Sequence, residues 1–298
     1  MEPDWDDLKV FLAVARGESL SAAGKALRRD PATVGRRVAR LEEALGAPLF
    51  VRAPTGYGLT EAGGRLLAHA EAVEQAVARG AEALRGEAAG LSGQVRIGAP
   101  DGCANYLLPQ VCARIHAEHP GLELQIIALP RVVNLSRREA DFAITVSPPA
   151  AGRLTVQKIT DYRLHLVAHR DYLENAPKIS ALEDVPQHPI VGYIPDMIFD
   201  AELDYLAETG AVTVALGSSA VSVQLGFLRE RAGLGIAHDF SLPFVPGLVK
   251  VLPEAVALTR SYYLIRHAGD ARIERLSRVG DMLIAGLRAE VARLEALT

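Results

Sequence analysis

The sequence predicts an α/β protein with two domains, a small helical one at the N-terminus and a larger one in which strands and helices alternate. Three observations support this fold class. Residues 5–45 carry apolar residues at helical spacing, residues 61–86 lack proline and keep one narrow apolar stripe, and short apolar runs alternate with helical patterns from residue 94 onward. The chain has 298 residues, 49% of them apolar and 23% charged, which is ordinary for a globular protein of this size.

The first predicted helix covers residues 5–16 and is amphipathic. Its buried face follows the spacing i, i+3, i+4 and i+7, which selects Leu8, Phe11, Leu12 and Ala15. A shorter helix is expected next, with Ser21 as its N-cap. Its packing face is made of small residues that let helix backbones approach closely, namely Ala22, Ala23, Ala26 and Leu27.

A third helix is expected to begin at Asp30 and Pro31, because aspartate is a favoured N-cap and proline already has the helical φ at the next position. One stripe of this helix should be buried, and it contains Val34, Val38, Leu41 and Leu45. A second stripe should place three guanidiniums on one exposed face, and it contains Thr33, Arg36, Arg37 and Arg40. Two short helices joined by a tight turn, the second one basic, are typical of a DNA-binding helix-turn-helix.

Positive charge is concentrated around this turn. Between residues 25 and 40 a single acid stands against six basic residues, although the whole chain has a net charge of −4, and those residues are Lys25, Arg28, Arg29, Arg36, Arg37 and Arg40. A local excess of this kind favours a nucleic-acid partner.

A β-hairpin wing and a long helix are expected to follow. Breakers at residues 46–48 end the third helix, and residues 49–51 and 57–59 can pair as strands. Arg52 at their base is placed either to touch a phosphate or to remain in solvent. From Thr60 to about residue 86 the apolar spacing is that of a short coiled-coil seam, formed by Leu66, Ala70, Val73, Val77, Gly80 and Leu84. Such a narrow stripe, with no partner nearby in the chain, needs a second copy of the chain. Small residues at 86–93 then form a hinge.

The remaining sequence alternates strands and helices. Strands are expected at 94–98, 122–127, 142–146, 162–168, 189–193, 212–216, 235–238 and 262–266, and helices at 106–118, 135–140, 200–208, 219–232 and 271–297. A repeated βα pattern implies a parallel sheet covered by helices, with ligands at the carboxyl ends of its strands.

Five separated motifs, at residues 7–15, 19–23, 32–42, 45–52 and 58–63, closely resemble the winged helix-turn-helix of LysR-type transcriptional regulators. Asp30 and Gly35 stand where serine is common in that family. Weaker landmarks at 98, 107–109, 119–120, 141–144 and 232–237 resemble the family's effector-binding domain, which has the architecture of periplasmic binding proteins. The resemblance implies a DNA-binding domain at 1–60, a linker and dimerisation helix at 61–90, and an effector-binding domain at 91–298. Within the last, subdomain I would cover about 91–161 and 267–298, and subdomain II about 162–266.

The resemblance also implies partners: double-stranded DNA with an inverted-repeat operator, a small-molecule effector, and a second copy of the chain in a homodimer or homotetramer. The expected DNA-binding residues are Ser21, Arg28, Arg29, Thr33, Arg36, Arg37, Arg40 and Arg52. Which of them reach base edges and which reach phosphates is left open by the sequence.

Effector contacts of the family, carried onto this chain, fall on Asp101, Gly102, Cys103, Pro130, Arg131, Thr145, Val146, Met197, Ser218, Ser219 and His238. Many relatives have a hydroxyl residue where Asp101 stands, and it binds a carboxylate together with the following helix N-terminus. An aspartate would repel an anion unless Arg131 compensates, so a carboxylate, a cationic and a neutral effector all remain open.

Other classes of function find little support in the sequence. We expect no catalytic residues, no metal and no cofactor, because no nucleophile elbow, phosphate loop or cluster of metal ligands occurs. Cys103 and Cys112 are expected to be buried thiols, although a redox role stays open. The acidic start of the chain and the lack of a long apolar run predict a cytoplasmic protein with no membrane contact. The alternative, a small-molecule binding protein without DNA function, is disfavoured by the basic helix.

Overall fold

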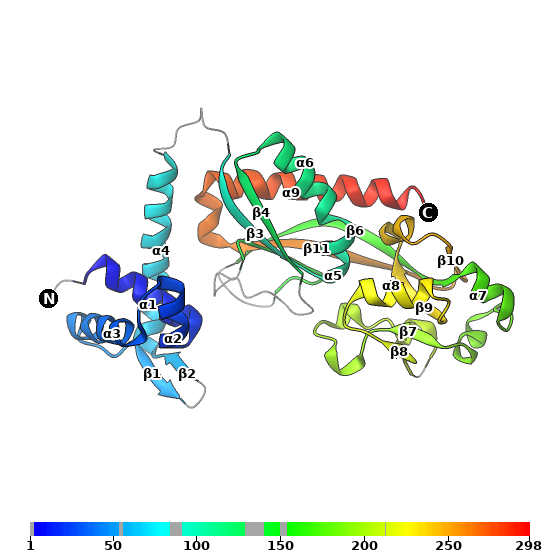
Figure 1. Cartoon of the computed structure of the whole chain (residues 1–298), viewed down its shortest axis with the longest axis horizontal. Helices are drawn as coiled ribbons and strands as arrows, with labels where there is room; N and C mark the ends of the chain where they lie inside the picture. The colour runs from blue at the N-terminus through cyan, green and yellow to red at the C-terminus, as the bar shows by residue number, and fades with distance from the viewer. Residues whose placement is uncertain (1–2, 54–55, 84–90, 129–139, 150–153, 212) are drawn as a thin grey trace. The chain divides into compact units, whose positions relative to one another are not determined.

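The computed structural model describes residues 3–53, 56–83, 91–128, 140–149, 154–211 and 213–298 (Figure 1). The chain divides into two compact units, one consisting mainly of the residues up to Ala89 and the other mainly of those from Gly90 onward. Each unit is described by itself below.

The N-terminal unit contains the predicted helices and hairpin. Its elements are α1 (Trp5–Gly17), α2 (Leu20–Leu27), α3 (Pro31–Leu45), β1 (Phe50–Ala53), β2 (Gly56–Leu59) and α4 (Glu61–Ala83). Helix α1 lies at the centre, since Val10 and Val14 pack towards α2 and α3 while Phe11 and Leu12 pack towards Leu41 and the hairpin. The helix-turn-helix and the antiparallel wing are therefore confirmed.

Two details of these helices differ from the prediction. The N-cap of α2 is Ser19, whose hydroxyl accepts hydrogen bonds from the amides of Ser21 and Ala22, so Ser21 lies in the first turn. The buried face of α2 contains Ala23 and Gly24, whereas Ala22 and Ala26 are exposed. Leu45 is 38% exposed, because α3 extends beyond the core that buries Val34, Val38 and Leu41.

The turn between α2 and α3 depends on a close backbone contact. A Cβ added to Gly24 would lie 2.6 Å from the carbonyl oxygen of Arg29, so only glycine fits there. Arg28 ends α2 in the left-handed conformation at φ 52°. Asp30 then caps α3, with Pro31 in its first turn, as the sequence predicts.

Helix α4 has a partner within the chain over its first half. Thr60 caps it by accepting the Gly63 amide at 3.0 Å, and Leu66 and Ala70 belong to the core around Phe11. The seam predicted without an intrachain partner is therefore wrong for these two residues. Val73 and Val77 are 41% and 51% exposed and continue the apolar stripe, while Leu84 lies outside the described residues.

The C-terminal unit is built on a sheet of nine described strands. Its order is β4-β3-β5-β11-β6-β9-β7-β8, with β10 paired to β6. The strands are β3 (Gly93–Ala99), β4 (Leu122–Ala128), β5 (Phe142–Thr145), β6 (Leu154–His169), β7 (Ile190–Gly192), β8 (Leu216–Gly217), β9 (Leu234–His238), β10 (Leu248–Lys250) and β11 (Ala257–His267). Strands β3, β4 and β5 are parallel, as are β7, β8 and β9, and the long antiparallel pair β6 and β11 joins these two groups.

Three described helices position the functional residues of this unit: α5 (Asp101–Tyr106), α8 (Val221–Arg229) and η7 (Asp239–Phe244). The other helical segments are α6 (Leu108–Glu118), α7 (Arg170–Asn175), η3 (Leu182–Gln187), η4 (Pro195–Met197), η5 (Ala201–Leu203), η6 (Ala207–Thr209), η8 (Ala268–Arg272) and α9 (Glu274–Glu295). Helices α6 and α9 are linked by an ion pair between Arg114 and the buried Glu290 at 3.0 Å.

Several boundaries differ from the sequence-based ones. The helix expected at 106–118 begins at Asp101 and is broken at Leu107, whose ψ of −51° comes with a φ of −122°. The helix expected at 200–208 is a pair of 3-10 turns, and the strand expected at 212–216 covers only Leu216–Gly217. The helix expected at 135–140 falls almost wholly outside the described residues.

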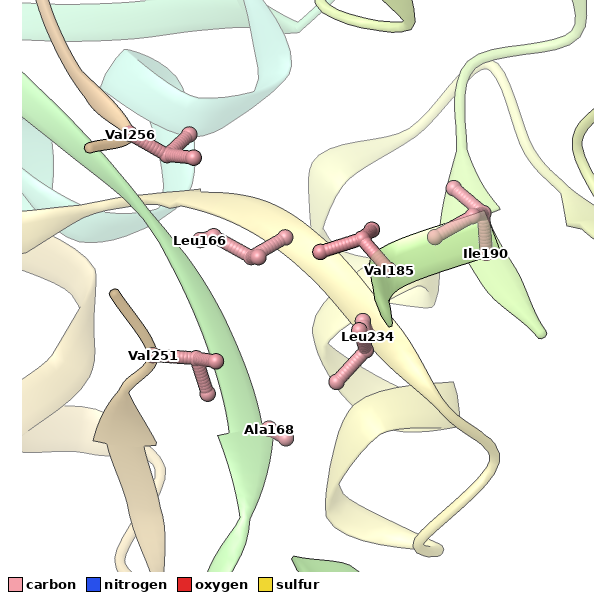
Figure 2. Close-up of a cluster of buried hydrophobic side chains, with 7 residues drawn as sticks. All are labelled: Leu166, Ala168, Val185, Ile190, Leu234, Val251 and Val256. Carbon is pink, nitrogen blue, oxygen red and sulfur yellow. The ribbon is translucent and has the colours of Figure 1, made fainter. Parts of the chain in front are cut away.

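An apolar cluster fixes the end of the sheet that contains β7. Figure 2 shows Leu166 and Ala168 of β6, Leu234 of β9 and Ile190 of β7 meeting Val185, Val251 and Val256. All of these side chains are buried. This cluster therefore fixes the position of β7 in the sheet. The residues that follow β7 begin at the carboxyl end of the strand.

Candidate functional sites

The outward face of α3 carries a short chain of hydrogen bonds. Asp30 accepts both the amide of Thr33, at 2.9 Å, and its hydroxyl, at 2.5 Å. The guanidinium of Arg36 donates to the same hydroxyl at 3.0 Å. The hydrogen bond from the Thr33 hydroxyl lowers the pKa of Asp30, and Arg36 adds to this effect. Arg36 is thereby oriented outward from an exposed helix face.

The other two arginines of the predicted stripe bind a buried carboxylate. Asp7 of α1 is 2% exposed and accepts Nε and Nη2 of Arg40, each at 2.6 Å, in a two-pronged pair. Arg37 lies 3.4 Å from the same carboxylate and its side chain is 22% exposed. The prediction of three exposed guanidiniums is therefore only partly right, because Arg37 and Arg40 hold α1 against α3.

The remaining predicted DNA contacts lie around this helix. Ser21, Arg28 and Arg29 are exposed in α2 and the turn that follows it. The backbone of Arg52 pairs with Tyr57 in the wing, and the Arg52 side chain is outside what the structure describes.

In the C-terminal unit, Asp101, the first residue of α5, contacts helix α8. Its Oδ2 accepts the backbone amide of Ser222, in the first turn of α8, at 2.9 Å, and its Oδ1 accepts the side-chain amide of Asn105 at 2.8 Å. No side chain of α8 itself caps that N-terminus. The chain's own carboxylate thus occupies a position at a helix N-terminus that favours an anion.

Contacts beside Asp101 bring more of the predicted ligand residues together. A Cβ added to Gly102 would lie 3.1 Å from the imidazole of His238, so α5 and the end of β9 touch there. Ser218 accepts the amide of Ala220 at 3.1 Å, just before α8. Tyr106 and Phe244 extend the same contact, with ring centroids 5.5 Å apart.

Other predicted ligand residues are placed differently. Thr145 is buried and donates to the carbonyl of Ser147 at 2.6 Å, and Ser147 donates in turn to Asp200. Val146 is buried, Ser219 is half-buried and Met197 is 50% exposed. Pro130 and Arg131 lie outside the described residues, so the compensation of Asp101 by Arg131 is not observed.

Sequence reasoning missed a group of aromatic residues around His238. Tyr162 of β6 stacks on Tyr262 of β11 with centroids 4.2 Å apart, and it also lies 5.4 Å from the His238 ring. Tyr193 and Tyr205 form a second pair at 5.9 Å. The crossover strands were expected, but nothing in their spacing indicated that Tyr162 meets His238 and Phe240 at the end of β9.

Both cysteines are buried thiols, as expected. Cys103 is fully buried in α5, and burial strongly raises its pKa. Burial likewise raises the pKa of Cys112 to about 11. Protonated, inaccessible thiols react slowly with oxidants. Among the residues described, no three His, Cys, Asp or Glu side chains are grouped to hold a metal, and no helix there combines the length and apolar character that crossing a membrane requires.

The contribution of the Asp101–Ser222 hydrogen bond to stability should be measurable. We expect Asp101→Ser to lower the free energy of unfolding of the C-terminal unit by about 1 kcal/mol, the usual cost of losing a helix cap, because serine is too short to reach the Ser222 amide. Guanidinium unfolding followed by far-UV circular dichroism measures this. Asp281→Ser is the matched control, since Asp281 is exposed on α9, and an equal loss in both variants would argue against the cap.

His238 should make stability depend on pH. Burial lowers its pKa to about 4 from the ordinary 6.5, with the carboxylate of Asp239 opposing the shift. Between pH 6.5 and about 4 the imidazole of His238 is protonated in the unfolded chain but neutral in the folded chain. The free energy of unfolding therefore decreases as the pH falls through this window, by up to about 3 kcal/mol. Urea unfolding at pH 7 and pH 4.5 should show a smaller pH effect in His238→Asn than in wild type. Equal pH effects would contradict the assignment.

Comparisons with known proteins find matches to both parts of the chain. Residues 5–64 match the bacterial regulatory helix-turn-helix protein, lysR family, and residues 88–288 match the LysR substrate binding domain. The transcriptional regulator GltR of Bacillus subtilis is 28% identical over 239 residues, 77% of either chain. The solved structure of a full-length OxyR variant from Pseudomonas aeruginosa aligns with a TM-score of 0.70 at 18% identity, covering 97% of this chain and 95% of that one. LysG of Corynebacterium glutamicum, solved with bound effector Arg, aligns with a TM-score of 0.64 at 18% identity, covering 95% and 98%.

The two structures support the fold alone at this level of identity, whereas the two family matches together span most of the chain. The chain therefore belongs to the LysR-type family of transcriptional regulators, which join a DNA-binding helix-turn-helix domain to an effector-binding domain.

Proposed function

We propose that this regulator reads its operator mainly through Arg36, with Thr33 and the exposed residues Ser21, Arg28 and Arg29 around it. This proposal rests on the different contacts that the three arginines of α3 make. Arg37 and Arg40 are bound to Asp7, whereas no ion pair holds Arg36 among the described residues. The Arg36 guanidinium uses only Nη2 for its exposed hydrogen bond to Thr33, which it can exchange for one to a base, and its planar fork of donors suits bidentate recognition of a guanine edge. Arg40 keeps an exposed edge that can reach a phosphate.

The test is fluorescence anisotropy of the full-length protein on duplex DNA from upstream of its own gene, across a salt series. We expect tight binding whose affinity falls steeply with salt, because each neutralised phosphate releases counterions. A scrambled duplex of the same length is the control. A small-molecule binding protein without DNA function would show no preference between the two duplexes.

The exposed end of α4 supports pairing of two copies of the chain, and hence an inverted-repeat operator. Val73 and Val77 continue the stripe of Leu66 and Ala70 beyond the core, where nothing described covers them. We expect Val77→Glu to weaken the dimer at least tenfold in sedimentation velocity, because it places a carboxylate in an apolar seam. Ala72→Glu on the same helix is the control, since Ala72 is exposed off the stripe. Equal dissociation of both variants would rule out this seam.

The ligand is proposed to act in the C-terminal unit, in the part of the sheet formed by β7, β8 and β9. Helix α8 of this part contacts Asp101 of α5, so we expect binding there to change that contact and, through it, how paired copies sit on the operator. We infer that the chain acts as a regulator and not as an enzyme, and that it does so in the cytoplasm, where the chromosome lies.

A further inference from the structure

A cavity of about 100 Å³ lies at the carboxyl end of β7. Ile190 of β7 and Ile236 of β9 form its floor, and the segment with η4, η5 and η6 supplies Ile198, Leu203 and Leu206 as further wall. All of its lining residues fall between Ile190 and Ile236, so the cavity belongs to the β7 group of strands alone. An apolar cavity of about 150 Å³ is enough to bind benzene in another protein. The cavity in this chain is smaller, so a single compact ring is the upper limit for the part of a ligand that it can enclose.

The polar groups of the lining are uncharged or negative. Tyr193 and Tyr205 contribute phenols, and Asp204 contributes a carboxylate that accepts the Leu206 amide at 3.3 Å. No lysine, arginine or histidine is among the described lining residues. Burial raises the pKa of Tyr193, and the nearby carboxylate of Asp101 raises it further. An anion placed here would find no cation among the described lining residues and would lie near the carboxylate of Asp204, which is unfavourable when the anion loses its water.

The hydroxyl of Tyr205 makes no hydrogen bond with the described residues. Tyr205 is 7% exposed, and its hydroxyl is buried without a hydrogen-bond partner among the described residues. A buried polar group left unpaired costs free energy, so such groups are expected to find a water or a ligand atom. Its ring lies against Tyr193 on the cavity wall. The site thus combines an apolar floor with Tyr205, whose buried hydroxyl lacks a partner among the described residues.

From this combination we propose that the cavity binds a compact, uncharged, largely apolar ring that carries one hydrogen-bonding group, and that such a molecule is the effector or the part of it that enters the C-terminal unit. The inference rests on the proposed function for its regulatory meaning, but the binding site itself does not. Of the carboxylate, cationic and neutral effectors that the sequence left open, this proposal favours a neutral one. The ligand would then bind away from the N-terminus of α8, where the carboxylate of Asp101 accepts the Ser222 amide.

The test uses the full-length protein without DNA and three probes of similar size: phenol, toluene and benzoate. Ligand-observed NMR titration gives their relative affinities. We expect phenol to bind at least tenfold more tightly than benzoate, because benzoate must bury its charge. Equal affinity of phenol and benzoate, or no detectable binding of phenol, would overturn the proposal.

Two variants locate the site. Tyr205→Phe keeps the ring and should remove most of the preference for phenol over toluene, about fivefold for one hydrogen bond. Val214→Phe fills the cavity and should abolish binding of both, whereas Val223→Phe, exposed on α8, should leave binding unchanged. If Val214→Phe fails to fold, the Tyr205→Phe result decides alone. Phenol binding that survives both variants would place the ligand elsewhere.

A parallel anisotropy measurement separates this proposal from the function on which it rests. Phenol that binds and shifts operator affinity supports both. Loss of DNA binding in every assay, with phenol still bound as expected, removes the regulatory proposal and leaves the ligand site standing. Specific DNA binding without phenol binding does the reverse.

Discussion

The double variant Arg37→Ala/Arg40→Ala is expected to unfold its N-terminal unit at a much lower urea concentration than the wild type. Both guanidiniums contact Asp7, whose carboxylate is 2% exposed. Removing the partners of a buried carboxylate is strongly destabilising, since the charge is left uncompensated. A unit of this size has only about 5–15 kcal/mol of stability in total. The cost is therefore a large share of what holds α1 against α3.

The single tryptophan makes this measurement specific. Trp5 opens α1, next to Asp6 and Asp7, so its fluorescence reports unfolding of the N-terminal unit without a contribution from the other. Arg36→Ala/Arg65→Ala is the matched control, because it removes two exposed guanidiniums that do not contact Asp7. Adding Asp7→Asn to the double variant should restore much of the loss. If the control loses as much stability, or if Asp7→Asn restores nothing, the buried pair is not the cause.

The pairing of Asp7 shows what the sequence could not reveal. The start of α3 was predictable because the signals are local: an aspartate cap, a proline after it and an apolar repeat. Asp7, by contrast, is an ordinary acid in the first turn of α1, where acids are expected anyway. Its partners lie thirty and more residues away along the chain, and their contact depends on the angle at which two helices cross.

In the C-terminal unit, too, features set by local sequence were predictable and those set by long-range contacts were not. Short apolar runs located most strands, because strands that are covered on both faces of a sheet carry nearly continuous apolar side chains. The prediction of a helix at residues 200–208 was wrong, since η5 and η6 are short 3-10 turns and Asp200 caps only the first of them. Tertiary contacts decide such short segments, and helical propensity is a weak guide there.

Asp101 illustrates how a residue singled out from the sequence can make a contact that the sequence does not indicate. The sequence indicated that its carboxylate would oppose an anionic ligand. The structure gives this carboxylate a partner in the Ser222 amide, more than a hundred residues away in the chain, so the position at the α8 N-terminus is already filled. Only the fold brings α5 and α8 together, and no local pattern around either helix signals the contact. The cavity beside Tyr205 follows the same rule, since its walls come from several separate segments.

Arg36→Ala is expected to weaken binding to operator DNA by about 10- to 100-fold, the usual cost of losing an arginine that reads a base edge. Arg36 is exposed on α3, and its guanidinium donates a hydrogen bond to the Thr33 hydroxyl of the same helix. Its removal should therefore leave the folding of the N-terminal unit unchanged, which the Trp5 signal verifies. The affinity is measured by anisotropy on operator and on scrambled duplex at several salt concentrations.

The comparison of the two duplexes decides what Arg36 does. If it reads a base, the variant loses affinity for the operator but little for the scrambled duplex, whereas a purely phosphate contact lowers both and reduces the salt slope by about one. Arg65→Ala is the control, because it removes the same charge from α4, where the arginine pairs with Glu61. An equal loss in Arg65→Ala would mean that net charge alone governs binding, and no change in Arg36→Ala would place recognition on other residues of the exposed face.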